Sequence, residues 1–153
     1  MPTSSRFAVA VHILTLLAQA GGEPLTSEAI AGSVNTHPAV IRRVLMALAR
    51  AGLTTTQFGA GGGALLARAP ETISLLAVYR AVEDGVVFGT PREAPNPTCR
   101  VGRRIQGVLE ERTAAATRAL EAELARDTIA DVLADVADAR HQPRRLTAPA
   151  RVG

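Results

Sequence analysis

The sequence predicts a mainly α fold with a small β-hairpin wing, namely a winged helix-turn-helix followed by a long C-terminal dimerisation helix. Two short amphipathic segments follow one another in residues 26–50, and the second presents arginines opposite its apolar side. Two segments of strand character then flank a run of glycines. A long helical segment in the second half carries a narrow apolar stripe, which is typical of a helix that pairs with another helix.

The composition fits one globular domain and excludes several kinds of site. With 153 residues, 47% of them apolar, the chain is long enough for one core and too short for two domains. All 17 basic residues are arginine, which excludes a P-loop lysine and a Schiff-base lysine. The formal net charge is +3, and the excess of arginine lies towards both ends of the chain. A basic N-terminal third is compatible with an anionic partner.

An apolar run near the N-terminus has two interpretations. Residues 7–17 follow Arg6 and lead into Ala18-Gln19-Ala20, which resembles a secretory signal with its cleavage site. The apolar residues repeat at the spacing of a packed helix, however, and the run is too short to cross a bilayer. We therefore expect a helix from Ser5 to Gln19, no association with a membrane, and a cytoplasmic protein.

The next two helices have recognisable starts. Thr26 is a good N-cap for a short helix, and Pro38 suits the first turn of the helix after it. One face of that third helix is apolar, through Ile41, Val44, Leu45 and Leu48. The opposite face carries Ala39, Arg42, Arg43, Met46 and Arg50. This face suits DNA, because an arginine guanidinium can bond guanine O6 and N7 together.

A glycine-rich hairpin is expected after the third helix. Two strand candidates, Leu53–Phe58 and Ala64–Arg68, flank the glycine run at 59–63. The spacing of Gly59, Gly61 and Ala64 also fits a dinucleotide-binding fingerprint. That motif needs a helix directly after the glycines, whereas a strand-like segment follows here. We therefore interpret the glycines as the tip of a wing.

The second half is predicted to be helical, with one interruption. Ser74 caps a helix that should reach Asp84, prolines then mark a loop, and a long helix should run from Thr98 to Ala125 before a short one starts at Asp127. The long helix exceeds what the core of one such chain needs, so a second copy is its natural partner. The expected organisation is a DNA-binding domain at 1–84, a proline-rich sensor loop at 85–98, dimerisation helices at 99–139 and a disordered basic tail at 140–153.

Cys99 is the one residue with redox chemistry, and it cannot form an internal disulfide. We expect it at the N-terminus of the long helix beside Arg100 and Arg103, where the helix dipole and cations lower the pKa of a thiol. An ordinary packed cysteine is the alternative.

No metal site and no catalytic set stands out in the sequence. His12, His37 and His141 lie on different elements without the spacing of metal ligands, although His37 is placed to touch a phosphate or a base. The acidic residues of the second half fit solvated helix faces. We therefore expect neither a metal ion nor enzymatic activity.

Several stretches together form a familiar pattern: Ser5-Arg6-Phe7-Ala8-Val9, Pro24-Leu25-Thr26-Ser27-Glu28-Ala29-Ile30-Ala31, Val34-Asn35-Thr36-His37-Pro38, the glycine run, and Asn96-Pro97-Thr98-Cys99-Arg100-Val101-Gly102. Over about residues 3–138 the chain resembles the Rrf2 family of bacterial winged-helix regulators. The resemblance implies a homodimeric transcription factor, usually a repressor, that binds an imperfect palindrome in double-stranded DNA.

By that resemblance, Ala39, Arg42 and Arg43 occupy base-reading positions, and residues 57–63 form a wing that approaches the minor groove. The residues expected at the DNA are Thr26, Thr36, His37, Pro38, Ala39, Val40, Arg42, Arg43, Arg50, Gln57, Phe58, Gly59, Gly61, Gly62 and Gly63.

The chain departs from the family pattern at several positions. Some members bind an iron–sulfur cluster through three cysteines in this region, whereas this chain has only Cys99, so we expect the cluster-free subgroup and no cofactor. Phe58 stands where other members place a wing arginine, and Ala64 where an aromatic residue often follows the glycines. His37 replaces a better capping residue such as Asn or Ser.

We therefore expect a homodimeric DNA-binding repressor controlled by the redox state of Cys99. Two alternatives stay open. One is a regulator of the same fold that senses a small molecule through the 75–100 region, with Cys99 structural. The other is a winged-helix adaptor that does not bind DNA. An oxidoreductase would need a resolving cysteine, which the chain lacks.

Overall fold

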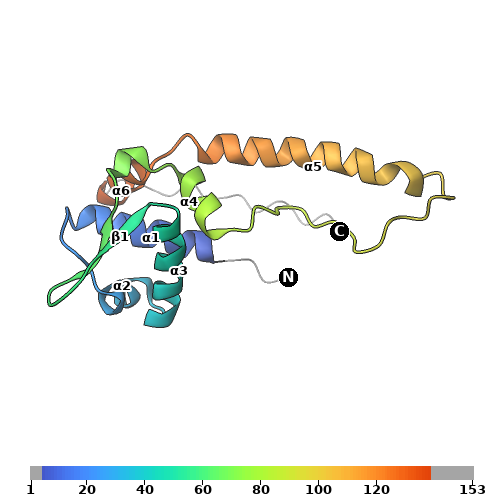
Figure 1. Cartoon of the computed structure of the whole chain (residues 1–153). Helices are drawn as coiled ribbons and strands as arrows, with labels where there is room; N and C mark the ends of the chain where they lie inside the picture. The colour runs from blue at the N-terminus through green and yellow to red at the C-terminus, as the bar shows by residue number, and fades with distance from the viewer. Residues whose placement is uncertain (1–4, 139–153) are drawn as a thin grey trace.

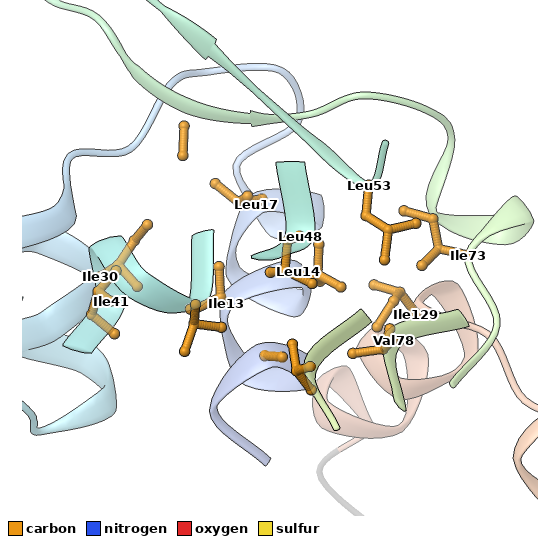
Figure 2. Close-up of a cluster of buried hydrophobic side chains, with 14 of the residues drawn as sticks. Ile13, Leu14, Leu17, Ile30, Ile41, Leu48, Leu53, Ile73, Val78 and Ile129 are labelled. Atoms are coloured by element: carbon orange, nitrogen blue, oxygen red, sulfur yellow. The ribbon is translucent and has the colours of Figure 1, made fainter. Parts of the chain in front are cut away.

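Helix α1 (Arg6–Gln19) is central to the fold in the computed structural model, which describes residues 5–138. Its residues Ala10, Ile13, Leu14 and Leu17 are at most 3% exposed and belong to the core drawn in Figure 2. The buried Thr15 hydroxyl donates a hydrogen bond to the carbonyl four residues before it, so no polar group is left unsatisfied there. The apolar N-terminal run is therefore a packed helix, as predicted.

Helices α2 (Ser27–Val34) and α3 (Pro38–Arg50) form the predicted helix-turn-helix (Figure 1). Thr26 caps α2 by accepting a hydrogen bond from a main-chain N–H at 3.2 Å. Asn35 ends α2 in the left-handed conformation (φ 58°, ψ 53°), which asparagine tolerates and which turns the chain tightly into α3. The predicted apolar face of α3 is confirmed, since Ile41, Val44 and Leu48 are buried.

Strands β1 (Thr54–Gln57) and β2 (Gly63–Leu66) pair antiparallel and form the predicted hairpin. Leu25 adds a bridge to β2, because its amide and carbonyl bond to the Ala64 main chain at 3.0 and 2.8 Å. The hairpin is thereby fastened to the start of the helix-turn-helix. Because β2 begins at the last glycine of the run, the strand-like interpretation of that segment is confirmed. A single 3-10 turn, η1 (Pro70–Thr72), comes next.

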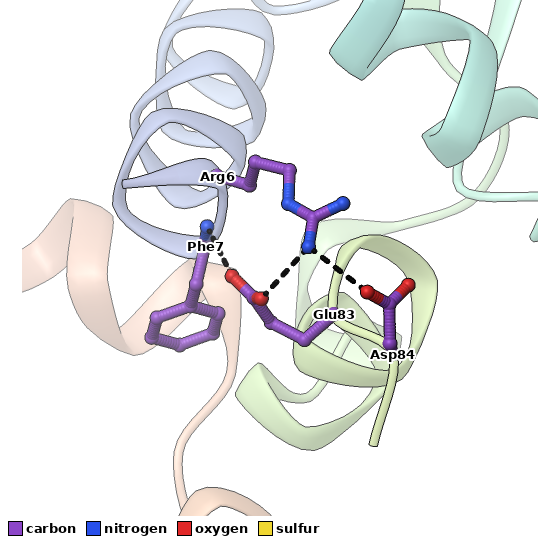
Figure 3. A network of polar contacts seen from close by, with 4 residues as sticks. All are labelled: Arg6, Phe7, Glu83 and Asp84. Carbon is purple, nitrogen blue, oxygen red and sulfur yellow. Dashed lines mark hydrogen bonds and ion pairs between the residues drawn. The ribbon is translucent and has the colours of Figure 1, made fainter. Parts of the chain in front are cut away.

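Helix α4 (Leu75–Val82) begins at the predicted Ser74 cap but ends before the predicted Asp84. Glu83 adopts an extended backbone (φ −107°, ψ 149°), and its carboxylate turns towards α1. There it accepts hydrogen bonds from the Phe7 N–H at 3.3 Å and from the Arg6 guanidinium at 3.4 Å (Figure 3). A contact with a distant part of the chain therefore fixes the end of α4.

Helix α5 (Gly102–Leu124) starts later than the predicted Thr98, so that boundary was wrong. The Asn96 side chain explains the difference, because its Oδ1 accepts hydrogen bonds from the Thr98 N–H at 2.9 Å and the Thr98 hydroxyl at 2.8 Å. The chain passes through turns before it becomes helical. Helix α6 (Ile129–Ala137) then starts with a reciprocal capping box rather than at the predicted Asp127.

The long helix and the last helix are placed very differently. Helix α5 runs along one side of the molecule and extends beyond the other helices, and it has no buried residue (Figure 1). Helix α6 returns to pack against α1, and Ile129 at its start is fully buried. No helix within residues 5–138 is long and apolar enough to cross a membrane. The predicted basic tail at 140–153 lies outside the described residues.

Candidate nucleic-acid interface

The outer face of α3 carries the side chains predicted to meet DNA. Ala39, Val40, Arg42, Arg43 and Arg50 are all exposed. They do not form one compact group, since the helical rise places Arg50 about 16 Å along the axis from Ala39. The first two turns of α3 therefore form the candidate reading surface, and Arg50 stands apart at the far end of the helix.

His37 holds the first turn of α3. Its Nδ1 atom accepts a hydrogen bond from the Ala39 N–H at 3.1 Å, so the imidazole serves as the N-cap. The ring is exposed, and Pro38 follows it at the first helical position. The cap fixes the direction in which Ala39 and the residues after it point. A contact of His37 with DNA stays a prediction.

Arg42 is engaged within the protein. Its guanidinium donates to the Glu28 carboxylate of α2, and the two groups form an ion pair. The two side chains are 58% and 61% exposed, so water screens the pair and its contribution to stability is small. In the sequence, Glu28 stands as an acid in the first turn of α2, where the helix dipole favours a negative charge, but nothing there indicates the pairing with Arg42. The pair was not predictable, because no periodicity connects residues on two different helices.

Other positive charges are available, two of them on α3 and one, Arg68, just after β2 and beside the end of α1. Within the described part of the chain, Arg43, Arg50 and Arg68 form no ion pair. A hollow of about 240 Å³ lies between α3 and β1, with Arg42 and Thr55 on its walls. A guanidinium group attracts phosphates, whose neutralisation dominates the affinity of proteins for DNA. Arg42 is the arginine in the lining of this hollow.

The wing contributes a neutral surface. No residue from Thr54 to Ala67 is charged. Phe58 lies just beyond β1, outside the strand that was predicted to include it, and is 88% exposed. Figure 1 shows the wing tip, α2 and α3 on the side of the molecule opposite α5. The two elements predicted to approach DNA therefore share one side of the protein.

Two threonines predicted at the DNA serve the local structure. The Thr26 hydroxyl caps α2, and the half-buried Thr36 donates its N–H to the Ala31 carbonyl at 3.1 Å. Both bonds hold the helix-turn-helix in shape. A role of either residue at DNA stays a prediction.

The glycines are needed for the shape of the wing. Gly59 (φ 93°) and Gly61 (φ 75°) adopt a backbone conformation that favours glycine. A Cβ at Gly62 would lie 2.1 Å from the Gln57 carbonyl oxygen, and one at Gly63 would lie 2.4 Å from the Leu25 carbonyl oxygen. These contacts leave no room for a side chain, so the wing can close only with glycine there.

Cys99 is exposed in the turns that precede α5. Hydrogen bonds from the main-chain N–H groups of Gly102 and Val101 lower the pKa of its thiol from the ordinary value of 9.0. The expected position at the very start of the helix was wrong by three residues, yet the unsatisfied amides of the helix start still reach the sulfur. The thiolate is thereby favoured, and the thiolate is the reactive form of a cysteine.

The residues present do not fit an iron–sulfur cluster. Clusters of this kind are held by several cysteine thiolates, and the chain has one cysteine. Within residues 5–138, no three His, Cys, Asp or Glu side chains are grouped so that they could hold a metal ion. A cluster on this chain would lack most of its thiolate ligands.

Comparisons with known proteins agree with this geometry. A family model described as "Rrf2: Iron-dependent Transcriptional regulator" matches residues 3–135. YwnA of Bacillus subtilis (strain 168), a candidate HTH-type transcriptional regulator, is 45% identical over 130 residues, which cover 85% of this chain and 96% of YwnA.

Solved structures of similar proteins share the fold. The crystal structure of a candidate DNA-binding protein has 44% identity and a TM-score of 0.69, and the match covers 84% of this chain and 99% of that one. IscR from T. potens has 25% identity and a TM-score of 0.66, and the match covers 92% of this chain and 91% of IscR.

The matched family and YwnA are described as transcriptional regulators, and the similar solved structure as a DNA-binding protein; none is described as an enzyme, in agreement with the prediction from the sequence. The mainly helical architecture with a two-stranded wing is confirmed as well. Because the family model spans most of the chain and a relative is 45% identical over nearly its whole length, the family is established. The chain belongs to the Rrf2 family of winged-helix transcriptional regulators.

Proposed function

We propose that the chain is a homodimeric repressor that binds an imperfect palindrome, with α3 in the major groove and the wing at the minor groove. The observation that carries this proposal is the arrangement of the exposed arginine face of α3 beside the wing, on one side of the molecule (Figure 1). An α-helix fits the major groove of B-DNA. The resemblance to other Rrf2 regulators supports the same reading.

Within α3, Arg42 and Arg43 are the base-reading residues. A guanidinium can bond two acceptors of guanine at once, and the small side chain of Ala39 lets the start of the helix approach the bases closely. Arg50 and Arg68, which form no ion pair among the described residues, supply contacts to flanking phosphates. DNA must compete with Glu28 for Arg42.

The dimer is proposed from the surface of α5. This helix of 23 residues buries none of them within the chain, and it is about 34 Å long. Val108 and Leu109 are 50% and 51% exposed on it. A second copy of α5 would cover these side chains, and a two-fold dimer would present two reading helices about one turn of DNA apart.

Cys99 is the proposed point of control. Its exposed thiol has a lowered pKa and lies just before the helix that joins the two subunits. In oxidation by hydrogen peroxide, the thiolate sulfur attacks one peroxide oxygen, an S–O bond forms as the O–O bond breaks, and hydroxide leaves and takes up a proton to become water; the product is a sulfenic acid. The added oxygen would disturb the main-chain hydrogen bonds at the start of α5, and with them the spacing of the two reading helices. The protein acts without an iron–sulfur cluster in this scheme.

A small-molecule effector is a second candidate, which one observation favours. A hollow of about 220 Å³ lies between the proline-containing loop and α5, lined by Phe88, Pro91, Leu109 and Glu110 among others. A small ligand bound there would join the loop to the long helix. In this version Cys99 is structural and its oxidation leaves DNA binding unchanged.

Binding of the full-length protein to DNA from upstream of its own gene tests the proposal. The protein, reduced or treated with hydrogen peroxide, is titrated against that DNA and against a scrambled duplex at about 150 mM salt, where specific binding should exceed non-specific binding by about 10³-fold or more. Cys99→Ser is the control for the thiol. Loss of specific binding on oxidation of the wild type but not of Cys99→Ser supports redox control. If oxidation removes specific binding from neither wild type nor Cys99→Ser, the result favours control by a small molecule.

Two variants test the remaining parts. The double substitution Arg42→Ala, Arg43→Ala should remove specific binding, and a protein that keeps it would argue for a different reading surface. Val108→Arg places a charge in the proposed dimer surface, outside the hollow beside the proline-containing loop, and should shift the mass in sedimentation towards a monomer. It should also weaken binding to a duplex with two half-sites more than to one with a single half-site. A wild-type protein without any preference among duplexes selected from a random pool would favour the adaptor alternative.

A further inference from the structure

Phe58 is an unusual residue for the tip of a wing. It is 88% exposed, the largest exposed fraction among the exposed large apolar residues of residues 5–138. Single exposed apolar side chains are common on protein surfaces, so exposure alone carries no function. Three properties of its surroundings set Phe58 apart: the support of its backbone, the absence of charge around it, and its place in the turn of the wing, on the same side of the molecule as α3 (Figure 1).

The backbone that carries Phe58 is closely held. Gln57, the residue before it, pairs with Gly63 across the hairpin, and the Gly62 N–H donates to the Gly59 carbonyl at 3.1 Å. The close approaches at Gly62 and Gly63 described above leave no free space within the turn. The ring is therefore presented by a closed turn, and little backbone entropy is lost when it meets a partner.

The wing offers no means of binding phosphates through charge. It is neutral from Thr54 to Ala67, and its one large side chain at the tip is an aromatic ring. A neutral, apolar tip gains little binding free energy from contact with the outside of a duplex, where the phosphates lie. It gains much more inside the minor groove, where sugars and the faces of base pairs are apolar.

We propose that Phe58 is an apolar wedge that enters the minor groove next to each half-site and partly unstacks one base step. This inference rests on the proposed function, since it takes α3 to be in the adjacent major groove. Proteins that insert such wedges kink the duplex, and the cost depends on the step that is opened. The wing then selects flexible pyrimidine–purine steps, such as TA, without a hydrogen bond to any base.

The test begins with a duplex that the full-length wild-type protein selects from a random pool. Its affinity is compared for wild type, Phe58→Ala, Phe58→Leu and Phe58→Arg, over a series of salt concentrations. We expect Phe58→Ala to weaken binding about tenfold. The slope of log affinity against log salt should not change, because no charge is removed. Phe58→Leu keeps a wedge and should lie within about threefold of wild type. Phe58→Arg should steepen the salt slope by about one per subunit.

A second readout follows the base step itself. The fluorescent base 2-aminopurine is placed at the step that footprinting assigns to the wing. Its fluorescence should rise on binding of wild type and Phe58→Leu, because the base loses its stacking, and should stay low with Phe58→Ala. Replacement of that step by a stiff A-tract should weaken binding of wild type several-fold and leave Phe58→Ala unaffected.

Three outcomes would overturn the wedge. If Phe58→Ala binds as tightly as wild type and keeps its step preference, the ring takes no part in recognition, while the repressor proposal stands. If Phe58→Ala alters sedimentation but not duplex affinity, Phe58 is a contact between protein molecules. If wild type selects no duplex at all, the proposed function and the wedge both fail. Circular-dichroism melting of each variant verifies that it is folded.

Discussion

Replacement of Glu28 by glutamine should tighten the binding of DNA. In the free protein one nitrogen of the Arg42 guanidinium is held by the Glu28 carboxylate, which in the proposed complex competes with DNA for this group. Glutamine has nearly the same shape as glutamate but no charge. The substitution therefore removes a competitor for the guanidinium while it preserves the first turn of α2.

The size of the effect follows from the exposure of the pair. Ion pairs with more than half of each side chain exposed contribute about 0.2–1 kcal/mol, which corresponds to a gain in affinity of about 1.5- to 5-fold when the pair no longer has to break. Removal of the repulsion between Glu28 and a phosphate on the order of 8 Å away adds about 0.5 kcal/mol in a high dielectric. The total is about 3- to 10-fold per half-site at low salt, and less at high salt.

Fluorescence anisotropy with a labelled duplex measures this effect, in wild type and in an Arg42→Ala background. The cycle of four proteins isolates the coupling between the two residues. Glu71→Gln is the matched control, because it removes one exposed negative charge from η1, away from the helix-turn-helix. Unfolding in urea should show that Glu28→Gln changes the free energy of unfolding by less than about 1 kcal/mol.

Two results would refute the reasoning. Weaker DNA binding by Glu28→Gln would mean that Glu28 orients Arg42 for its contact with DNA instead of competing for it. An equal gain in wild type and in the Arg42→Ala background would mean that only the general repulsion between Glu28 and phosphates matters.

Three further predictions follow from the structure. Leu48→Ala should lower the free energy of unfolding by about 2–5 kcal/mol in urea titrations, since Leu48 is 0% exposed, and a loss below about 1 kcal/mol would contradict its place in the core. The rate of alkylation of Cys99 by iodoacetamide should reach half its maximum at a pH below 9.0, because the thiol pKa is lowered, and an inflection at or above that pH would argue against the main-chain hydrogen bonds. Hydrogen bonds from Thr128 lower the pKa of Asp131 from 3.8. Above pH 3.8, wild type should therefore be more stable to unfolding than Asp131→Asn, by a difference that comes from the charged carboxylate. This difference should disappear as the pH falls through that lowered pKa, and thermal unfolding across this range measures it; a difference independent of pH would show that the charge of Asp131 is not involved.

The features that were predictable from the sequence are local ones. Thr26 and Ser74 are caps because a hydroxyl one residue before a helix can accept a hydrogen bond from its first turn, and both bonds form. Pro38 marks the start of α3, and the periodic Ile41 and Leu48 mark its buried side. In each case the information lies within one or two turns of the residue concerned.

The boundaries that were wrong depend on competition from other groups. Asn96 takes the Thr98 N–H and hydroxyl, which delays the start of α5, and Glu83 leaves α4 to bind the start of α1. The first is a side-chain to main-chain bond that a pattern of apolar residues does not register. The second joins residues that are 76 positions apart. Only the packing of α4 against α1 brings that carboxylate to its partner.

The candidate site shows the same division. The outward direction of Arg42 and Arg43 follows from the period of α3 and was predictable. The pairing of Arg42 with Glu28 was not, because it depends on the angle and distance between α2 and α3. The exposure of Phe58 likewise required the hairpin to close just before it, at Gln57.

The position of Cys99 limits how a signal can reach the reading helix. Helix α5 joins the rest of its own chain near its C-terminal end, where the Arg80 guanidinium bonds to Glu121 at 3.0 Å and where α6 begins to return to α1. Cys99 precedes the opposite end of the helix, about 34 Å away along its axis. Figure 1 shows that this end of α5 lies far from α3. A modification of the thiol therefore acts at the end of α5 that is remote from α3, and within one chain it can reach α3 only through α5 itself or through the loop that precedes it. In the proposed dimer, the more direct route is the packing of α5 against its counterpart, which would set the distance between the two reading helices. Control through Cys99 should thus affect a duplex with two half-sites and spare one with a single half-site, whereas a direct effect on α3 would weaken both.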